Sequence, residues 1–477
     1  MGRHGWNSGA GRSRLIALLG VGMAVLALVV TLINTLPGSG ASTAGTSRDG
    51  DKVHGTPATP PGTTRPYVGW GFTHTQYSAD EGGAAATERV EQLLAKNGGL
   101  PQNQHIMGWG ADNPEPVEGR YDFGAMDRRI DFMRRSGATP VITLCCSPDW
   151  MKGGKAGVDH TDWSQAALET APTPDHYQDF ANLAATVAKR YPDVRHFIVW
   201  NEFKGFWNDA RGRWDYEGYT TMYNLVYKAL KKVNKDIMVG GPYLVMDSVD
   251  PRQKEDASTT LKGAWGALDQ RVLDAFDYWN AHRAGADFVV VDGSSYTNDD
   301  DMLPDEFAAT DKLTAVGEWV RRQTHDLPLW WAEYYVEPAE PGDGNDDRKG
   351  WSETHRLAVQ ATGMIAMVRG GADSGFYWNP EEEKGSACAG CLWTPTDSGA
   401  GGRELPMYDL VARFGRAFPP GTRCRAVSVA EDDVPNVRVL ATDRTVLVVN
   451  VLDRPISARV DGKRFDMRAY EVRWLTR

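Results

Sequence analysis

Two glutamates in this sequence each follow an apolar run that reads as a buried β-strand. Glu202 ends the run VRHFIVWNE, which starts at Val194, and Glu333 lies in LPLWWAEYY, which starts at Leu327. Burying a carboxylate is unfavourable unless it is paired, hydrogen-bonded or used in chemistry. Either glutamate alone would read as a salt-bridged loop residue, but together they suit cleavage of a glycosidic bond. That reaction needs one carboxyl protonated, to donate to the leaving oxygen, and one ionised, to attack the anomeric carbon.

Aromatic side chains near both glutamates are predicted to set their proton affinities. An apolar wall beside Glu202 would raise its pKa, as an acid requires. The residues predicted to form this wall are Trp200, Phe203, Phe206 and Trp207. The hydroxyls of Tyr334 and Tyr335 are predicted to hold Glu333 ionised and oriented.

Four further residues are candidates for contacts with a sugar. Trp378, in FYWNP, is the preferred stacking platform, with core packing as the alternative, and the Tyr296 hydroxyl would add a hydrogen bond or simply pack. His74, in FTHTQYS, would contact a sugar hydroxyl or be incidental, and Trp207 would line a subsite. Other tryptophans expected in the same layer of loops, as subsites or as filling, are Trp109, Trp150, Trp214 and Trp393.

The elements that must position these residues form a recurring strand-then-helix pattern. The strand candidates are near-continuous apolar runs, typical of parallel strands buried on both faces. They begin at Tyr67, His105, Thr139, Val194, Ile237, Asp287, Leu327 and Ser374. Eight such units predict an α/β fold, a (β/α)₈ TIM barrel with long loops, whose chemistry lies at the C-terminal ends of the strands. An open doubly wound sheet is the alternative, but no GxGxxG opens a helix after any strand.

The chain is predicted to divide into five parts. Residues 1–14 are a basic segment, 15–36 run without a charge from Leu15 to Leu36, 37–66 are a flexible linker, 67–420 are the barrel, and 421–477 are a β module. The short alternating runs of the last part predict a sandwich-like all-β unit that packs on the barrel, alone or with strands from near the start of the fold.

The uncharged segment indicates export. Its 22 residues would span roughly 33 Å as a helix, enough to cross a bilayer with the basic flank inside. A single-pass signal anchor and a cleaved signal peptide both remain open, because small residues at Ser39 and Ala41, or at Ser42 and Ala44, suit a signal peptidase. Both interpretations place the remainder outside the cytoplasm, with the membrane contacted only through this segment.

The net charge and the tryptophan content indicate which classes of partner the protein binds, and the cysteines indicate a disulfide. The net charge of -11 argues against nucleic acid, and 17 tryptophans suit stacking on sugar rings. Cys388 and Cys391, in SACAGC, are predicted to form a disulfide. Cys145 and Cys146 are adjacent on a predicted strand, so they are expected to point to opposite faces as small core residues.

No metal and no cofactor is expected. DGNDD, which starts at Asp343, lacks the residues that complete an EF-hand loop. This segment and the acidic runs at 299–301 and 381–383 read as solvated loops, whose charge disfavours acidic substrates.

Several motifs together resemble a known family. The Asn201–Glu202 pair, with a second glutamate ending strand seven, is similar to the clan of retaining (β/α)₈ glycoside hydrolases. Within it, IVWNEF, VGGP at 239–242, the DF that opens strand six and the small β module look most like glycoside hydrolase family 39, which contains β-xylosidases and α-L-iduronidases. The resemblance implies Glu202 as general acid/base, Asn201 as the ligand of the sugar 2-hydroxyl, and Glu333 as nucleophile. The family usually has a histidine where Ser294 stands, which weakens transfer of a particular substrate.

The function predicted on these grounds is a retaining O-glycoside hydrolase acting on an extracellular polysaccharide or oligosaccharide. Its two carboxyl groups should then be about 5 to 5.5 Å apart. The alternatives are a catalytically idle carbohydrate-binding or surface-assembly barrel, and a transglycosylase or lyase. The sequence leaves the sugar, the anomer, endo or exo cleavage and the oligomeric state open.

Overall fold

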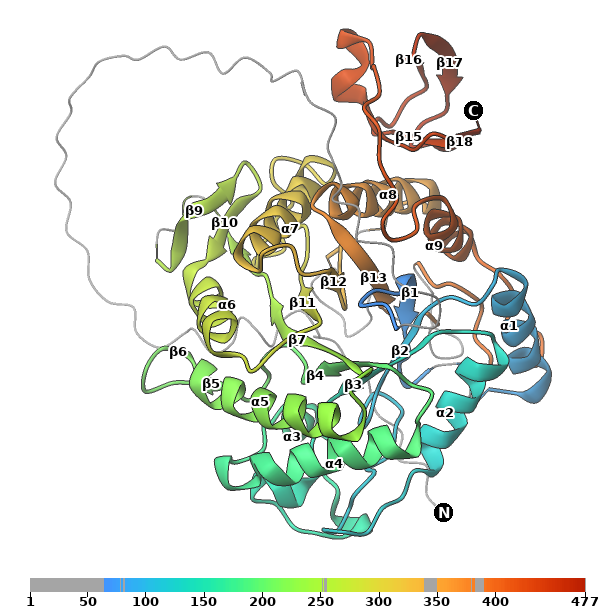
Figure 1. Cartoon of the computed structure of the whole chain (residues 1–477). Helices are drawn as coiled ribbons and strands as arrows, with labels where there is room; N and C mark the ends of the chain where they lie inside the picture. Colours follow the sequence, from blue (N-terminus) through green and yellow to red (C-terminus); the bar gives the residue numbers. More distant parts are fainter. Residues whose placement is uncertain are drawn as a thin grey trace, which may run out of the picture.

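Eight parallel strands close into a barrel at the centre of the molecule (Figure 1). The computed structural model describes residues 64–476 apart from 78, 80, 81, 251, 253, 254, 339–349, 379 and 382–389. The strands, in chain order, are β1 (Gly69–Thr73), β2 (Gln102–His105), β3 (Pro140–Leu144), β4 (His196–Val199), β7 (Met238–Val245), β11 (Phe288–Asp292), β12 (Leu329–Trp331) and β13 (Ala372–Trp378). The barrel closes where β1 pairs with both β2 and β13. The predicted (β/α)₈ barrel is therefore confirmed.

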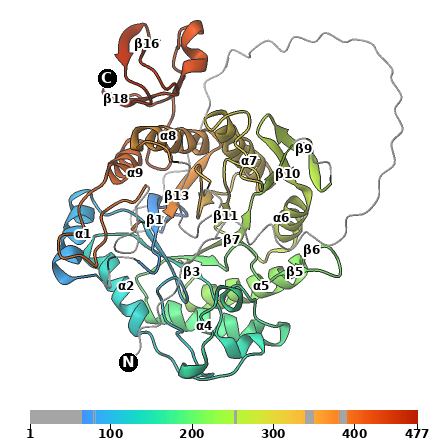
Figure 2. The same ribbon diagram turned by 180° about the vertical axis from the view of Figure 1, so that it is seen from behind.

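A ring of helices surrounds the barrel, one after each strand (Figures 1 and 2). These helices are α1 (Ala84–Lys96), α2 (Gly124–Arg135), α4 (Tyr177–Arg190), α5 (Tyr216–Val233), α6 (Gln270–His282), α7 (Asp311–Gln323), α8 (Glu353–Arg369) and α9 (Pro406–Ala417). Their apolar positions recur at helical spacing, as in α4, which buries Phe180, Leu183, Ala184 and Val187 against the barrel. Ser352 caps α8 by accepting a hydrogen bond from the N–H of His355.

The second strand begins earlier than its apolar pattern predicted. It consists of the polar residues QNQH, and the predicted run from His105 starts where the strand ends. Hydrogen bonds rather than apolar contacts hold Asn103 in this strand. Its side-chain amide donates to Thr73 at 3.2 Å and accepts from the hydroxyl of Thr143 at 2.9 Å. Because these buried polar side chains satisfy one another, hydrophobicity did not mark the strand.

Apolar side chains fill the interior of the barrel. The fully buried cluster consists of Val141, Ile198, Tyr243, Phe288, Val290, Trp330, Ala332 and Phe376. The rings of Phe288 and Trp330 stack with centroids 4.0 Å apart and an interplanar angle of 16°. Gly240 has no side chain because a Cβ there would lie 2.1 Å from the Phe288 ring. The Trp330 indole donates to the carbonyl of Pro66, so the chain entering the fold lies against this end of the barrel.

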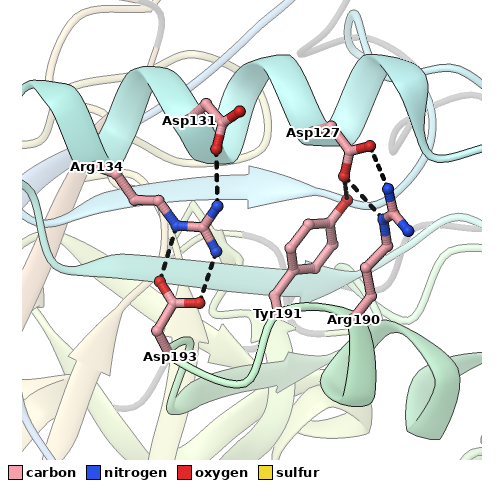
Figure 3. Close-up of polar contacts among 6 residues, drawn as sticks. All are labelled: Asp127, Asp131, Arg134, Arg190, Tyr191 and Asp193. Atoms are coloured by element: carbon pink, nitrogen blue, oxygen red, sulfur yellow. Dashed lines mark hydrogen bonds and ion pairs between the residues drawn. The ribbon is translucent and has the colours of Figure 1, made fainter.

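Two arginine clasps join α2 to the end of α4 (Figure 3). Arg134 forms a two-pronged contact with Asp193, at 2.9 and 2.6 Å, and also binds Asp131. Arg190 binds both oxygens of Asp127, which also accepts a hydrogen bond from the Tyr191 hydroxyl at 2.9 Å. These side chains are partly exposed, so each pair contributes little stability, but the paired geometry fixes how the two helices lie.

Small β elements interrupt the barrel between strands and helices. The hairpin β5 (Trp207–Asn208) and β6 (Arg213–Trp214) lies between β4 and α5. A three-stranded sheet of β8 (Ser248–Val249), β9 (Ala257–Gly263) and β10 (Gly266–Asp269) lies between β7 and α6 (Figure 1). The short helix α3 (Gln165–Leu168) follows β3. These excursions account for the long loops that the sequence predicted.

Antiparallel sheets form a separate unit at the C-terminal end (Figures 1 and 2). Its strands are β14 (Val437–Ala441), β15 (Thr445–Asn450), β16 (Ile456–Val460), β17 (Lys463–Met467) and β18 (Val472–Thr476). Within the described residues, its sheets take no strand from the start of the fold. Arg369 of α8 donates to the carbonyl of Val439, and Trp474 lies against Phe418, so the unit packs on the barrel as expected.

The expected membrane segment at 15–36 and nearly all of the linker lie outside the described residues. In the part of the chain that is described, no helix combines the length and the apolar character needed to cross a bilayer.

The packing of the barrel interior yields a stability prediction. Replacing Phe288 with Ala should lower the free energy of unfolding by about 3 to 5 kcal/mol, because it removes a buried ring and leaves a cavity beside Trp330. Tyr121→Ala is the control, since Tyr121 is 43% exposed, and should cost about 1 kcal/mol or less. Guanidinium unfolding followed by tryptophan fluorescence would measure both. Equal losses for the two variants would contradict the packing described here.

Candidate active site

Three carboxyl groups meet where the strands end. Glu202 follows β4, Glu333 follows β12, and Asp292 is the last residue of β11. One carboxyl oxygen from each of the three lies within 4.8 Å of the others. Because parallel barrel strands end at the same face, residues far apart in sequence converge there. The structure thus brings the two predicted glutamates together and adds an aspartate.

Two tyrosine hydroxyls hold Glu333. Tyr243 donates to Oε1 and Tyr335 donates to Oε2, each at 2.6 Å. Burial and the charge of Glu202 raise the pKa of Glu333 to about 7, although both hydrogen bonds act in the opposite direction. Tyr335 was predicted for this contact. Tyr334, predicted with it, lies on the other face of the chain, with its ring 6.4 Å from that of Trp70.

A β-bulge aims Tyr243 at Glu333. Along the pairing of β7 with β11, Val290 lies opposite Pro242 and Val291 opposite Leu244, so Tyr243 is left over. Its φ is 58°, in the left-handed region that only a constrained non-glycine residue adopts. Bulges of this kind redirect a side chain next to an active site. The main chain holds Tyr335 from the other side, because its N–H donates to the carbonyl of Gly293 at 3.1 Å.

Glu202 forms an ion pair with Lys204. The ammonium lies 2.8 Å from Oε2 of Glu202 and 3.3 Å from Oε1 of Glu169. Burial by itself would raise the pKa of Glu202, but the charge of Lys204 and hydrogen bonds with Asp292 and Lys204 hold it below its ordinary value. The expectation that aromatic neighbours raise this pKa is therefore wrong.

The aromatic residues around Glu202 point away from it. The indole of Trp200 donates to the carbonyl of Lys204 and its ring packs on Phe180 of α4. Phe203 packs on Tyr219 of α5, with ring centroids 3.9 Å apart. The backbone turns sharply at this point, with φ values of 68° at Trp200 and 51° at both Glu202 and Phe203. Left-handed conformations at bulky residues cost free energy and cluster at functional sites.

An aromatic wall continues from Lys204. The ammonium lies 5.1 Å from the ring centre of Trp109, which is 4.8 Å from His105 and 6.5 Å from Trp378. Trp378 is 8% exposed, so a small part of its surface is accessible. Burial and the charge of Lys204 lower the pKa of His105 to about 3, and this imidazole is neutral. Stacking of Trp378 on a sugar ring stays a prediction.

Asn201 immediately precedes Glu202 and is almost fully buried. Its side chain lies next to that of His105. Its Oδ1 has no hydrogen-bond partner among the residues that the structure describes. A buried amide oxygen without a donor is available to accept a hydrogen bond from a ligand hydroxyl.

Two predicted sugar-binding residues lie elsewhere. His74 is fully buried, with Nε2 2.8 Å from Oε1 of Gln102 and its ring against Phe132 of α2. Burial and the charge of Arg129 lower its pKa to about 3, so the expected contact of His74 with a sugar is wrong: it is a core residue. Trp207 belongs to the β5–β6 hairpin, where the guanidinium of Arg271 lies 5.2 Å from its ring centre. Among the described residues, no hydrogen bond joins it to the three carboxyl groups.

Tyr296 is buried beside Ser294. Its carbonyl accepts hydrogen bonds from the Ser294 hydroxyl at 2.9 Å and from Lys312 Nζ at 3.2 Å. The hydroxyls that hold Glu333 come from Tyr243 and Tyr335, so a contact of Tyr296 with substrate stays a prediction.

Glu381, in the loop after β13, is buried rather than solvated. Glu381, expected in a solvated run, is 3% exposed and accepts hydrogen bonds from the Trp393 indole and from Thr396. Trp393 is fully buried and fills the loop layer. Burial raises the pKa of Glu381 to about 7 despite these donors. The DGNDD segment at 343–347 lies outside the described residues.

The cysteines differ from expectation in one respect. Cys145 and Cys146 lie past the end of β3 at Leu144, so strand alternation does not separate them, and their sulfur atoms are 2.7 Å apart. Cys391 is disulfide-bonded. Its expected partner, Cys388, lies outside the described residues, so that pairing stays a prediction.

Three members of the site were not identified from the sequence. Tyr243 and Asp292 each stand at the end of a predicted strand, the signal that singled out the two glutamates. Lys204 lies two residues after Glu202, in a loop where the spacing of residues does not show where a side chain points.

Comparisons with known proteins agree with this geometry. The sequence model described as "Glycosyl hydrolases family 39" matches residues 110–348, about half of the chain and including both glutamates. A relative called "Beta-xylosidase", from Caldicellulosiruptor saccharolyticus, is 25% identical over 233 residues; the match covers 46% of this chain and 41% of the relative, less than half of its length.

Solved structures share the fold. A conserved exported protein from Bacteroides fragilis superposes with a TM-score of 0.58 at 13% identity, covering 87% of this chain and 99% of that chain. A monomeric β-xylosidase from Caulobacter crescentus CB15 superposes with a TM-score of 0.51 at 16% identity, covering 81% and 74%. The family match, the barrel and the two glutamates at the ends of its strands agree, and the chain belongs to glycosyl hydrolase family 39.

Proposed function

We propose that this protein is a retaining O-glycoside hydrolase that cleaves an extracellular oligosaccharide or polysaccharide. The observation that carries the proposal is that oxygens of Glu202 and Glu333 lie within 4.8 Å of each other at the barrel mouth. Retaining enzymes place their carboxyl groups about 5 to 5.5 Å apart, whereas inverting enzymes leave about 6.5 to 9.5 Å for a water molecule. The short separation supports direct attack by a carboxylate.

Glu333 is the nucleophile in this proposal. Its two tyrosine donors favour the ionised form and orient one oxygen toward an anomeric carbon. Glu202 is the general acid that protonates the leaving oxygen, and then the base that activates water to hydrolyse the glycosyl-enzyme. Asn201 binds the sugar 2-hydroxyl, and Trp378 stacks on the ring being cleaved. A sugar acceptor in place of water would give transglycosylation through the same intermediate.

Aryl β-D-xylosides are the first probes for activity, because a relative of this chain is called a β-xylosidase. The chain matches only part of that protein, so a panel of other aryl glycosides belongs in the same screen. The described surface of the site contains several carboxyl groups and one lysine, which supports a neutral sugar over a uronic acid.

We infer that the protein acts outside the cytoplasm. The uncharged segment 15–36 follows three arginines within the basic segment, the arrangement of an export signal or anchor. The disulfide at Cys391 supports the same location, since such bonds persist in oxidising compartments.

Replacing Glu333 with Ala should abolish formation of a glycosyl-enzyme on every substrate, because no other group attacks the anomeric carbon. A 2-deoxy-2-fluoro glycoside should label the wild-type protein at Glu333, as peptide mass spectrometry would show, and leave Glu333→Ala unlabelled. An inverted anomeric product by NMR would refute the retaining mechanism, and no turnover across the panel would favour an idle carbohydrate-binding barrel.

Glu202→Ala should behave differently from Glu333→Ala. Activated nitrophenyl glycosides need little protonation of the leaving group, so the glycosyl-enzyme should still form, while phenyl glycosides and natural linkages stall. The second step then lacks its base. Azide, which needs no deprotonation, should restore turnover and give a glycosyl azide of retained configuration. Absence of azide rescue with a folded variant would remove Glu202 from the acid/base role.

Tyr243→Phe should shift the acid limb of the kcat/KM profile for a nitrophenyl glycoside to higher pH. The nucleophile must be ionised, its pKa is about 7, and the Tyr243 hydrogen bond lowers that pKa. Loss of the bond should move the limb upward by about one pH unit. Tyr334→Phe is the matched control, because its ring lies on the other face, and its limb should not move. Identical profiles for both variants would contradict this role.

A further inference from the structure

The third carboxyl group, Asp292, has no place in the two-carboxylate mechanism. It is 1% exposed, and one of its oxygens lies within 4.8 Å of an oxygen of the proposed acid and of an oxygen of the proposed nucleophile. A buried carboxylate is unfavourable unless it is paired and hydrogen-bonded, and otherwise the group takes up a proton. The protonation state of Asp292 therefore needs an explanation.

The three carboxyl groups differ in their hydrogen-bond donors. Glu333 accepts from two tyrosine hydroxyls, and Glu202 is paired with an ammonium. Oδ1 of Asp292 has no donor among the described residues. An ionised buried carboxylate needs donors on its oxygens, so Asp292 is the member of the trio that is least able to be charged.

The ion pair with Lys204 conflicts with the proposed role of Glu202 as general acid. A general acid must carry a proton when the leaving oxygen departs, yet the ammonium 2.8 Å away favours the ionised carboxylate. Asp292 shares a hydrogen bond with Glu202, and it is the adjacent group from which a proton can come.

We propose that Asp292 holds the catalytic proton in the resting site and passes it to Glu202 when substrate binds. The inference rests on the proposed function and makes Asp292 a positioning residue that acts through Glu202. In the resting site the Asp292 carboxylic acid donates a hydrogen bond to the Glu202 carboxylate. The proton crosses this bond, which leaves Asp292 ionised and Glu202 protonated, and Glu202 then gives the proton to the departing oxygen.

The second half of the reaction restores the pair. Glu202 takes a proton from the attacking water and returns it across the same hydrogen bond to Asp292. The pair thus holds one proton before the first step and one after the second, so proton and charge balance over the cycle. The charge of Lys204 offsets the single negative charge that the pair carries at rest.

Other charged and titratable groups around the pair come from several elements. They are Lys204, Glu169, His105, Glu333, Tyr243, Tyr335, Lys312 and Asp247. Burial, the hydrogen bond to Glu202 and the charges of Glu202 and Glu333 hold the pKa of Asp292 well above its usual range, against a hydrogen bond from the N–H of Gly293. Burial lowers the pKa of Lys312 to about 8, and the charge of Asp247 opposes this shift more than the charge of Asp292 does.

Asp292→Asn tests the proposal, because asparagine keeps the shape and cannot carry the proton. Glu202 would then stand alone beside Lys204 and be ionised at neutral pH. For a phenyl glycoside, kcat/KM at neutral pH should fall by at least about ten-fold and the pH optimum should move lower, with a smaller loss for the nitrophenyl analogue. Asp373→Asn, the same change at a half-buried carboxyl at the start of β13, should leave the profile in place.

A double variant separates proton supply from structural damage. Lys204→Met in the Asp292→Asn background removes the ammonium that keeps Glu202 ionised, and burial should return the proton to Glu202. The optimum for the phenyl glycoside should therefore move back toward higher pH. An Asp292→Asn profile identical to the wild type, or a double variant whose optimum does not recover, would overturn the proposal.

Infrared spectroscopy locates the proton without any activity. Wild-type protein labelled with ¹³C at its aspartate side-chain carboxyls should show a shifted band of a protonated carboxyl at about pH 8, where Asp247, whose pKa burial raises to about 6, is ionised. The band should persist in Asp373→Asn and vanish in Asp292→Asn. Absence of the wild-type band would refute the proposal even if the variant fails to fold. A band in a protein that turns over no glycoside would instead refute the proposed function alone.

Discussion

The burial of three carboxyl groups beside the ammonium of Lys204 is the constraint on which this site depends. Taking Glu202, Asp292 and Glu333 out of water is unfavourable unless donors, a counter-charge or a proton compensates each of them. Two tyrosine hydroxyls donate to Glu333, and Lys204 pairs with Glu202. Oδ1 of Asp292 has no donor in the described part of the chain. The bulge in β7 and the left-handed backbone after β4 place these groups, because regular strand and turn geometry would not.

The barrel supplies rigidity at a distance from this chemistry. Its interior is closed by stacked aromatic rings around Phe288 and Trp330, while the opposite end carries the polar and ionisable groups. Outside the strands, α2 and α4 are fixed to each other by the arginine clasps of Figure 3, and the C-terminal sheets pack on the barrel through Arg369. The strand ends therefore hold their side chains in place through packing that takes no part in the reaction.

Family membership and local chemistry answer different questions. The family match covers the region with both glutamates, and the solved structures share the fold at 13% and 16% identity. At such low sequence identity these proteins share the barrel fold. The residues next to Glu202 decide which of its protonation states are accessible. Lys204 and Asp292 are such neighbours, and the fold alone does not determine the charges that they place beside Glu202.

The sequence by itself determined the barrel, the order of its strands and helices, and the two glutamates, because apolar runs and residues at their ends are local signals. It missed the start of β2, whose buried amides satisfy one another, and it placed His74 at the site although the chain turns it into the core. It also predicted a raised pKa for Glu202. Only the tertiary structure decided that Tyr243 reaches Glu333, that Lys204 turns back on Glu202 and that Oδ1 of Asp292 has no donor among the described residues, because side-chain direction at bulges and turns is set by partners far away in sequence.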